Sequence, residues 1–152
     1  KEIDYYTIAL LLGLFVVIGG LKSAGVIDVI GNAIAKLGSG SEFIIYTIIV
    51  WISVILSAFI DNIPYTATML TIVPVIASDM GMEPKLLYYG LLCGATLGGN
   101  LTPIGARANI AGIGILKKEG YEVKATTFMK YGVPFTLAAV ITGYILLWLI
   151  WS

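Results

Sequence analysis

The fold is decided by the stretch Gly98-Gly99-Asn100-Leu101-Thr102-Pro103-Ile104-Gly105-Ala106-Arg107-Ala108-Asn109, which lies in the middle of a long apolar run. The run extends from Leu86 to Leu116 and contains a single charged residue, Arg107. Glycine and asparagine weaken a helix, and a proline in its interior also removes a backbone hydrogen bond. We therefore expect a broken helix over 86–116, with two half-helices joined by an unwound loop near residues 100–109.

The composition requires a lipid environment for most of the molecular surface. Of the 152 residues, 59% are hydrophobic and only 12% are charged, and the mean hydropathy is +0.97. An average soluble domain carries about 25% charged residues. We therefore expect an all-α membrane protein that crosses the cell membrane several times.

Charge and residue types exclude several classes of function. Nine basic residues balance nine acidic ones, which argues against a nucleic-acid partner. The absence of histidine removes the usual zinc, haem and triad chemistries. No Gly-Lys-Ser/Thr sequence of a nucleotide-binding loop occurs. We expect no cofactor, and energy from an H⁺ or Na⁺ gradient or from a partner subunit.

A second interruption lies at Asp61-Asn62-Ile63-Pro64, between the charge-free run 43–60 and the shorter run 65–78. As a helix at ~1.5 Å per residue, the run 65–78 would reach about 21 Å, short of the ~30 Å hydrocarbon core. This predicts a re-entrant hairpin over 43–78 whose tip stops inside the membrane. Two ordinary spans, with Asp61 in a surface turn, are the alternative.

The remaining apolar runs predict three more helices. These are a transmembrane helix over 5–21, an amphipathic interfacial helix over 24–37 and a transmembrane helix over 131–151. Lysines are more numerous on the side that carries Lys1 and the 117–130 loop, so the positive-inside rule places that side in the cytoplasm and the C-terminus outside.

Because the sequence starts without methionine and with two early acids, we expect the chain to begin inside a longer gene product. Trimming of a short protein is the alternative.

Asp61 and Arg107 carry the only charges inside otherwise uncharged segments. A charge at the bilayer centre costs roughly 2.5–3.5 kcal/mol on insertion scales, so such residues usually face a partner, a cavity or a substrate path. The alternative is a mutual salt bridge that only holds the hairpin to the broken helix. An intramembrane aspartyl protease needs two carboxylates at one site, and only Asp61 is available, so an enzyme is not expected.

Neutral side chains that carry oxygen atoms lie near both Asp61 and Arg107 in the sequence. Such oxygens can bind a hard cation or a small polar solute. Free carbonyls at half-helix C-termini would favour a cation, and free N–H groups at half-helix N-termini would favour an anion. Sodium is expected at Asp61, Asn62 and Asn100. The candidate substrate- and ion-binding residues are Asp61, Asn62, Thr66, Gly99, Asn100, Thr102, Pro103, Gly105, Arg107 and Asn109. Gly94 and Gly98 are instead candidates for close helix packing.

Two motifs resemble signatures of the ArsB/NhaD/P-protein branch of the ion transporter superfamily. Ser57-Ala58-Phe59-Ile60-Asp61-Asn62-Ile63-Pro64-Tyr65-Thr66-Ala67-Thr68-Met69 is similar to the hairpin signature of that branch. The stretch from Gly94 to Ile110 is similar to its second signature, and Gly13 to Leu21 resembles the span before the hairpin. The resemblance covers nearly the whole chain and is more specific for the superfamily than for a substrate.

The resemblance implies a fold of two inverted repeats, each with a re-entrant hairpin and a discontinuous helix, often in a dimer. This chain would be the C-terminal repeat, and its partners would be the lipid bilayer, a small inorganic ion or oxyanion, and an N-terminal repeat or a second copy in a homodimer. Related dicarboxylate carriers have Ser-Asn-Thr at the hairpin tip, so Asn62 carries over while Asp61 departs and favours proton or sodium exchange. Arg107 departs from the usual small residue and would attract an anion or neutralise Asp61.

These observations predict a secondary active transporter of the arsenite/anion type or the Na⁺/H⁺ exchange type, with its substrate between the hairpin tip and the broken helix. The alternative is a non-transporting membrane scaffold or subunit in which Asp61 and Arg107 form a structural pair.

Overall fold

The computed structural model describes residues 5–38 and 40–152. In these ranges the chain forms helices and no strand, which confirms the predicted all-α class. Lys1, which enters the lysine count, lies outside the described residues. The helices are α1 (Tyr5–Ser23), α2 (Val26–Leu37), α3 (Glu42–Ser57), α4 (Asn62–Met80), α5 (Lys85–Gly98), α6 (Arg107–Lys118) and α7 (Ala125–Trp151).

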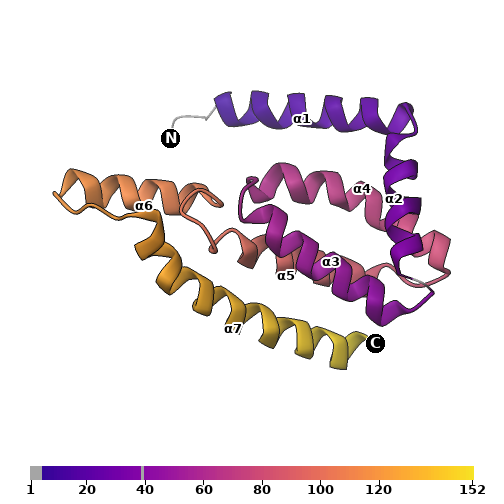
Figure 1. Ribbon diagram of the computed structural model, residues 1–152. Coiled ribbons are helices and arrows are strands. Elements are labelled where there is room, and N and C mark those ends of the chain that lie inside the picture. Colours follow the sequence, from indigo (N-terminus) through magenta and orange to yellow (C-terminus); the bar gives the residue numbers. More distant parts are fainter. Residues whose placement is uncertain (1–4, 39) are drawn as a thin grey trace.

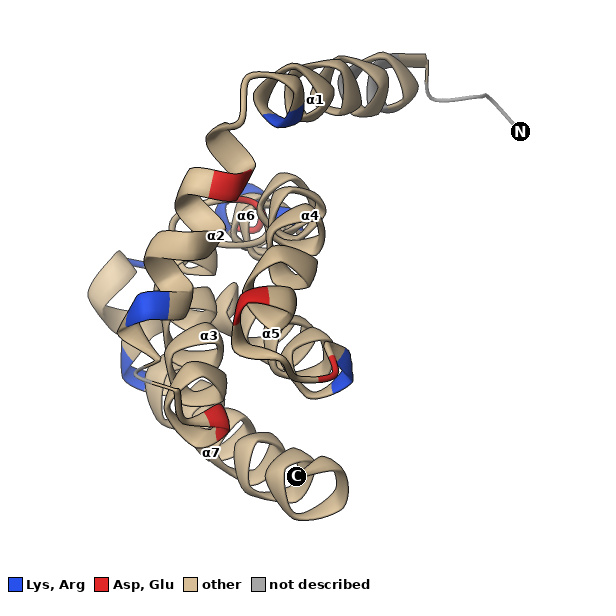
Figure 2. Ribbon diagram, turned by 90° about the vertical axis from the view of Figure 1, so that its right-hand side faces the viewer, with Lys and Arg blue, Asp and Glu red and all other residues tan. Residues whose placement is uncertain are grey.

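Several helices are apolar and long enough for a membrane. In the described residues, α4 and α7 each have the length and composition to cross a bilayer. The segment Leu11–Ser23 of α1 passes the same test together with α2, with a bend of 73° between them, and α3 is apolar but shorter. Charged residues gather mostly near helix ends, so most of the ribbon in Figure 2 is uncharged. These features support a membrane protein, while the depth of each helix in the bilayer stays a prediction.

Two helix interruptions meet near the middle of the molecule. The first is the tip 58–61, where α3 ends and α4 turns back along it, and the second is the break 99–106 between α5 and α6. In Figure 1, α5 runs beside α3 toward the tip, and α6 continues past the tip in the same general direction. The break therefore lies level with the tip, and α6 extends beyond both.

Close packing of α5 on α3 fixes the position of the break relative to the tip. Gly90, Gly94 and Gly98 lie one turn apart on the buried face of α5. A Cβ added at Gly98 would meet the carbonyl oxygen of Val54 at 2.5 Å, and one added at Gly94 would meet the main chain of α3 even more closely. The two backbones are therefore in direct contact, as expected for Gly94 and Gly98 from the sequence.

Aromatic contacts attach α7 to the opposite end of α3. The hydroxyl of Tyr46 donates to the carbonyl oxygen of Tyr144 at 2.9 Å, and the two rings stack with centroids 5.1 Å apart. Phe43 adds an edge contact to the ring of Trp148 at 4.9 Å. The α7 helix thus lies along α3 and α5 and covers one side of the break.

The glycine contact predicts a strong effect of Gly94→Ala. The new methyl group would press on the main chain of α3, and overpacking of this kind costs about 1–3 kcal/mol. We expect a lower thermal unfolding temperature of the intact protein in detergent, followed by tryptophan fluorescence. Gly13→Ala in α1 is the matched control, because no atom lies within 4 Å of the added Cβ there. Equal unfolding temperatures for the two variants would show that α3 and α5 do not pack through their backbones.

Candidate ion-binding site

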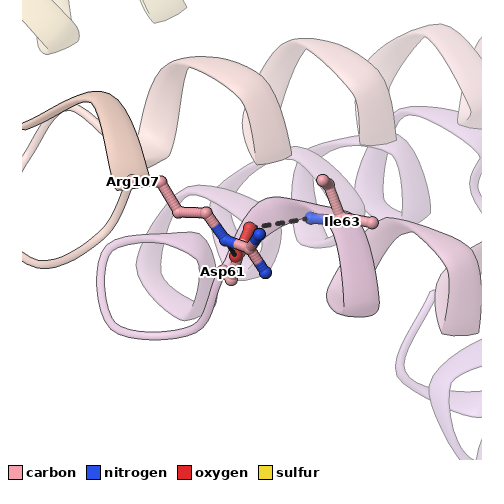
Figure 3. A network of polar contacts seen from close by, with 3 residues as sticks. All are labelled: Asp61, Ile63 and Arg107. Atoms are coloured by element: carbon pink, nitrogen blue, oxygen red, sulfur yellow. Dashed lines mark hydrogen bonds and ion pairs between the residues drawn. The ribbon is translucent and has the colours of Figure 1, made fainter. Parts of the chain in front are cut away.

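An ion pair joins the hairpin tip to the broken helix. The Nε of Arg107 donates to Oδ2 of Asp61 at 2.7 Å. The other carboxylate oxygen of Asp61 accepts a hydrogen bond from the backbone N–H of Ile63 at 3.3 Å, as Figure 3 shows. The side chains keep 54% exposure for Arg107 and 26% for Asp61. The pair is therefore open to the surroundings on one side.

Both members of the pair sit at helix N-termini. Asp61 is the N-cap of α4, and Arg107 is the first residue of α6. Aspartate is a preferred N-cap residue because its carboxylate accepts from the unpaired N–H groups of the first turn. A cation at the same kind of position is unfavourable by itself, since the N-terminal end of a helix is positive. The negative charge of Asp61 compensates for this at Arg107.

The loop 99–106 is attached to the hairpin tip by Thr102. Its hydroxyl donates to the carbonyl oxygen of Ala58 and accepts from the backbone N–H of Gly105 at 3.0 Å. Thr102 is buried, with 6% exposure. One hydroxyl therefore pairs a free carbonyl of the tip with a free N–H of the break.

Asn109 closes the same loop from the α6 side. Its side-chain amide donates to the carbonyl oxygens of Gly99 at 3.0 Å and Thr102 at 3.1 Å. These carbonyls follow the end of α5 and have left the helical hydrogen-bond pattern. In this structure the amide group of Asn109 stabilises the unwound backbone.

Gly105 is the point of closest backbone approach in the site. A Cβ added there would meet the carbonyl oxygens of Gly99 at 2.6 Å, Ala58 at 2.8 Å and Ser57 at 2.9 Å. No side chain fits among three carbonyl groups, so only glycine allows this contact. The position of Gly105 thus explains the glycine that the sequence places in the break.

The structure brings some of the predicted site residues together and places others apart. Asp61 and Arg107 form the ion pair, and Gly99, Thr102, Gly105 and Asn109 form the network beneath it. Pro103 is partly buried within the loop itself. Asn62 and Thr66 lie on the first turns of α4, and no hydrogen bond joins their side chains to the loop in the described part of the chain. Asn100 instead lines a hollow against α7.

Sequence reasoning missed Ser57. Its buried hydroxyl donates to the carbonyl oxygen of Ala95 and so ties the end of α3 to α5. A serine at the end of an apolar run, directly before the tip, was the available signal. Within residues 5–38 and 40–152, no group of three or more His, Cys, Asp or Glu side chains is placed to hold a metal ion.

The fold and the site define an all-helical membrane protein in which two interrupted segments hold an ion pair between them. A family model described as citrate transporter matches residues 1–152. The chain belongs to the citrate transporter family. It is 33% identical to human P protein over 149 residues, which confirms the predicted resemblance to the branch that contains P protein.

Other relatives are mycobacterial membrane proteins. The chain is 33% identical over 151 residues to an uncharacterized transporter of Mycobacterium tuberculosis and 32% identical to a 46 kDa membrane protein of Mycobacterium leprae. Each match covers 98% of this chain and 35% of the relative, and the match to human P protein covers 93% of this chain and 18% of that protein. The chain thus spans about a third of the length of its mycobacterial relatives. No solved structure matches it.

The bridging role of Thr102 predicts that Thr102→Val destabilises the break. The substitution keeps the shape but leaves the carbonyl of Ala58 and the N–H of Gly105 without their partner. A buried polar group left in this way costs about 1–3 kcal/mol. Hydrogen exchange of the intact protein should therefore become faster in peptides that cover residues 99–106.

Thr102→Ser is the matched control, because it keeps the hydroxyl and removes only a methyl group. We expect exchange close to that of the unaltered protein. If the serine and valine variants exchange at the same rate, the hydroxyl bridge does not hold the loop.

Proposed function

We propose that this chain forms part of a secondary active transporter and holds a small anion between the hairpin tip 58–61 and the break 99–106. The observation that carries the proposal is the pairing of Asp61 with Arg107 where the two interruptions meet. Charges inside membrane segments usually mark a substrate or ion path. Discontinuous helices that face each other are typical of transporter binding sites.

The membrane position is part of the proposal. At ~1.5 Å per residue, α3 and α4 are about 24 Å and 28 Å long, so α4 is longer than the charge-free run 65–78 and its length alone does not require a re-entrant hairpin. The free ends of both helices lie at the same end of the molecule. The break adjoins the tip, and α6 continues beyond it. We propose that the hairpin is re-entrant, so that the ion pair lies within the membrane and is reached through a water-filled space.

The geometry favours an anion as the transported species. Arg107 uses its Nε for Asp61, and the terminal amino groups of its guanidinium can bind a carboxylate or another oxyanion in two-point fashion. The positive ends of α4 and α6 lie at the same place. The family description, citrate transporter, also names an anionic solute. We therefore favour anion transport over Na⁺/H⁺ exchange and include citrate among the solutes to test.

Asp61 supplies a means of coupling. Its negative charge competes with a solute anion for Arg107. When Asp61 takes up a proton, or when Na⁺ binds between Asp61 and a neighbouring oxygen such as that of Asn62, this competition falls. Uptake of H⁺ or Na⁺ would then favour anion binding in the same site. The alternative of a structural scaffold also uses the Asp61–Arg107 pair, but it predicts no flux.

Flux measurements separate these possibilities. The intact protein in proteoliposomes should take up labelled citrate or arsenite when a Na⁺ or pH gradient is imposed. Asp61→Asn should make uptake insensitive to the gradient, and Arg107→Gln should lower it at least tenfold. The pair is partly exposed, so its loss should cost less than about 1 kcal/mol of stability. The loss of flux should therefore occur in folded protein.

Glu83→Gln with Lys85→Gln is the matched control. These residues form the other ion pair of the described chain, at 3.6 Å and with both side chains mostly exposed. Glu83 lies in the link after α4, and Lys85 is the first residue of α5. Their removal should leave flux unchanged. If the unaltered protein takes up no more solute than protein-free liposomes under either gradient, the transporter proposal is wrong. If uptake by Asp61→Asn still depends on the gradient, Asp61 is not the coupling residue.

A further inference from the structure

Two hollows share lining residues at the start of α7: the first lies along α7 against Asn100 of the break, and the second lies between α6 and the start of α7. Their volumes are about 430 Å³ and 470 Å³. Val123 and Phe128 line both, while Tyr131 and Phe135 line only the first and Leu116 lines only the second. The walls are mainly apolar, and each hollow has the volume of a site for a sizeable organic group.

A third, smaller hollow forms a basic mouth to this pair. It has a volume of about 200 Å³ and is lined by Lys117, Tyr121 and Lys124, together with Glu122. Val123 lines it as well and so connects it to both apolar hollows. Across residues 117–130, lysine stands at 117, 118, 124 and 130 and glutamate at 119 and 122, so the region is positive.

The N-terminus of α7 adds to the positive potential at this mouth. Lys124 is the N-cap residue, and no side chain accepts a hydrogen bond from the first turn. Free N–H groups and the positive end of the helix therefore point toward the space beside Lys124. Such a helix end binds a phosphate group readily, and here two lysines line the same space.

We infer that this composite pocket binds an anionic phospholipid. One acyl chain occupies the two apolar hollows on either side of Val123 and Phe128, and the phosphate group lies at Lys117, Lys124 and the first turn of α7. The inference rests on the pocket and on membrane insertion, and it does not use the Asp61–Arg107 pair, although Asn100 and Asn109 of the candidate site line the hollows. Because the count of lysines on the two sides predicts that residues 117–130 lie at the cytoplasmic surface, the site would face the leaflet that is rich in anionic lipids.

The chemistry of the pocket favours a lipid over other occupants. A soluble anion would use the lysines but would leave the apolar walls of Phe128 and Phe135 exposed. A purely apolar molecule would fill the hollows without using the basic mouth. A phospholipid with a negative headgroup satisfies both parts at once, and it is already present in the surrounding membrane.

The test is lipid binding to the delipidated intact protein, measured by native mass spectrometry with phosphatidylglycerol and with phosphatidylcholine. Phosphatidylglycerol should bind more tightly. Lys117→Gln with Lys124→Gln should weaken its binding about 10- to 30-fold, since each basic residue near an anionic lipid contributes about 1 kcal/mol. Lys22→Gln with Lys36→Gln, which changes two exposed lysines on α1 and α2, is the charge-matched control and should leave the affinity unchanged.

A second variant tests the apolar part without touching the lysines. Gly112 lines the second hollow, and no atom lies within 4 Å of a Cβ added there. Gly112→Leu would therefore fill the hollow with its side chain while improving the helix propensity of α6. It should weaken phosphatidylglycerol binding at least fivefold and leave the preference over phosphatidylcholine in place.

Each remaining outcome would overturn the inference. Equal affinity for the two lipids would exclude recognition of the charged headgroup. Unchanged binding by Gly112→Leu would show that the lipid is held only by surface charge. Displacement of the lipid by millimolar glycerol 3-phosphate would identify a site for soluble anions. Failure of the delipidated protein to bind any lipid at the pocket would show that another protein segment covers it.

Discussion

The structure depends on one constraint, which is that backbone groups released from a helix must find partners inside the protein. Two interruptions in apolar segments release N–H and C=O groups at four helix ends. In hydrocarbon each group left unpaired costs several kcal/mol. Thr102 and Asn109 provide partners for four of them, and the bond from Thr102 to Ala58 connects the break to the tip. The interruptions are therefore stable only as a pair, which explains why they lie at the same level.

Glycine makes this pairing geometrically possible. The buried face of α5 carries Gly90, Gly94 and Gly98, so its backbone lies directly on α3. With larger residues the two helices would stand farther apart, and the hydroxyl of Thr102 would not reach the carbonyl of Ala58. Gly105 continues the same contact beyond the end of α5, among three carbonyl oxygens. Packing and hydrogen bonding in the site thus depend on the same small residues.

The sequence predicts the interruptions well because their residues have local effects. Proline, glycine and asparagine weaken a helix, and on this ground the sequence predicts interruptions at 61–64 and near 100–109. The structure places them at 58–61 and 99–106. The predicted C-terminal bound of each was wrong, because Asn62 to Pro64 form the first turn of α4, where proline is tolerated, and Arg107 to Asn109 begin α6. Helix ends were harder to place. The run 65–78 is charge-free, yet α4 extends from Asn62 to Met80, and α7 begins at Ala125 and includes Lys130, because a charged residue near a helix end need not stop the helix. The partners of Asn109 and the position of Asn100 against α7 depend on how the break folds back on itself, which no local pattern encodes.

The solvent exposure of the Asp61–Arg107 pair determines how much free energy it costs to break this ion pair. Breaking a sealed, buried pair costs roughly 3–5 kcal/mol, because an unpaired charge remains in a medium of low dielectric constant. A pair that is partly open to water contributes about 1 kcal/mol or less, and here Arg107 keeps 54% and Asp61 26% exposure. In the proposed mechanism, a solute anion that binds Arg107 would replace Asp61 at a small cost, provided that water reaches the site. The deeper network of Thr102, Gly105 and Asn109 is buried or partly buried and does not need to open for this exchange. In this proposal the hydrogen-bonded network stays in place, and the weak ion pair above it is the part that a solute would exchange.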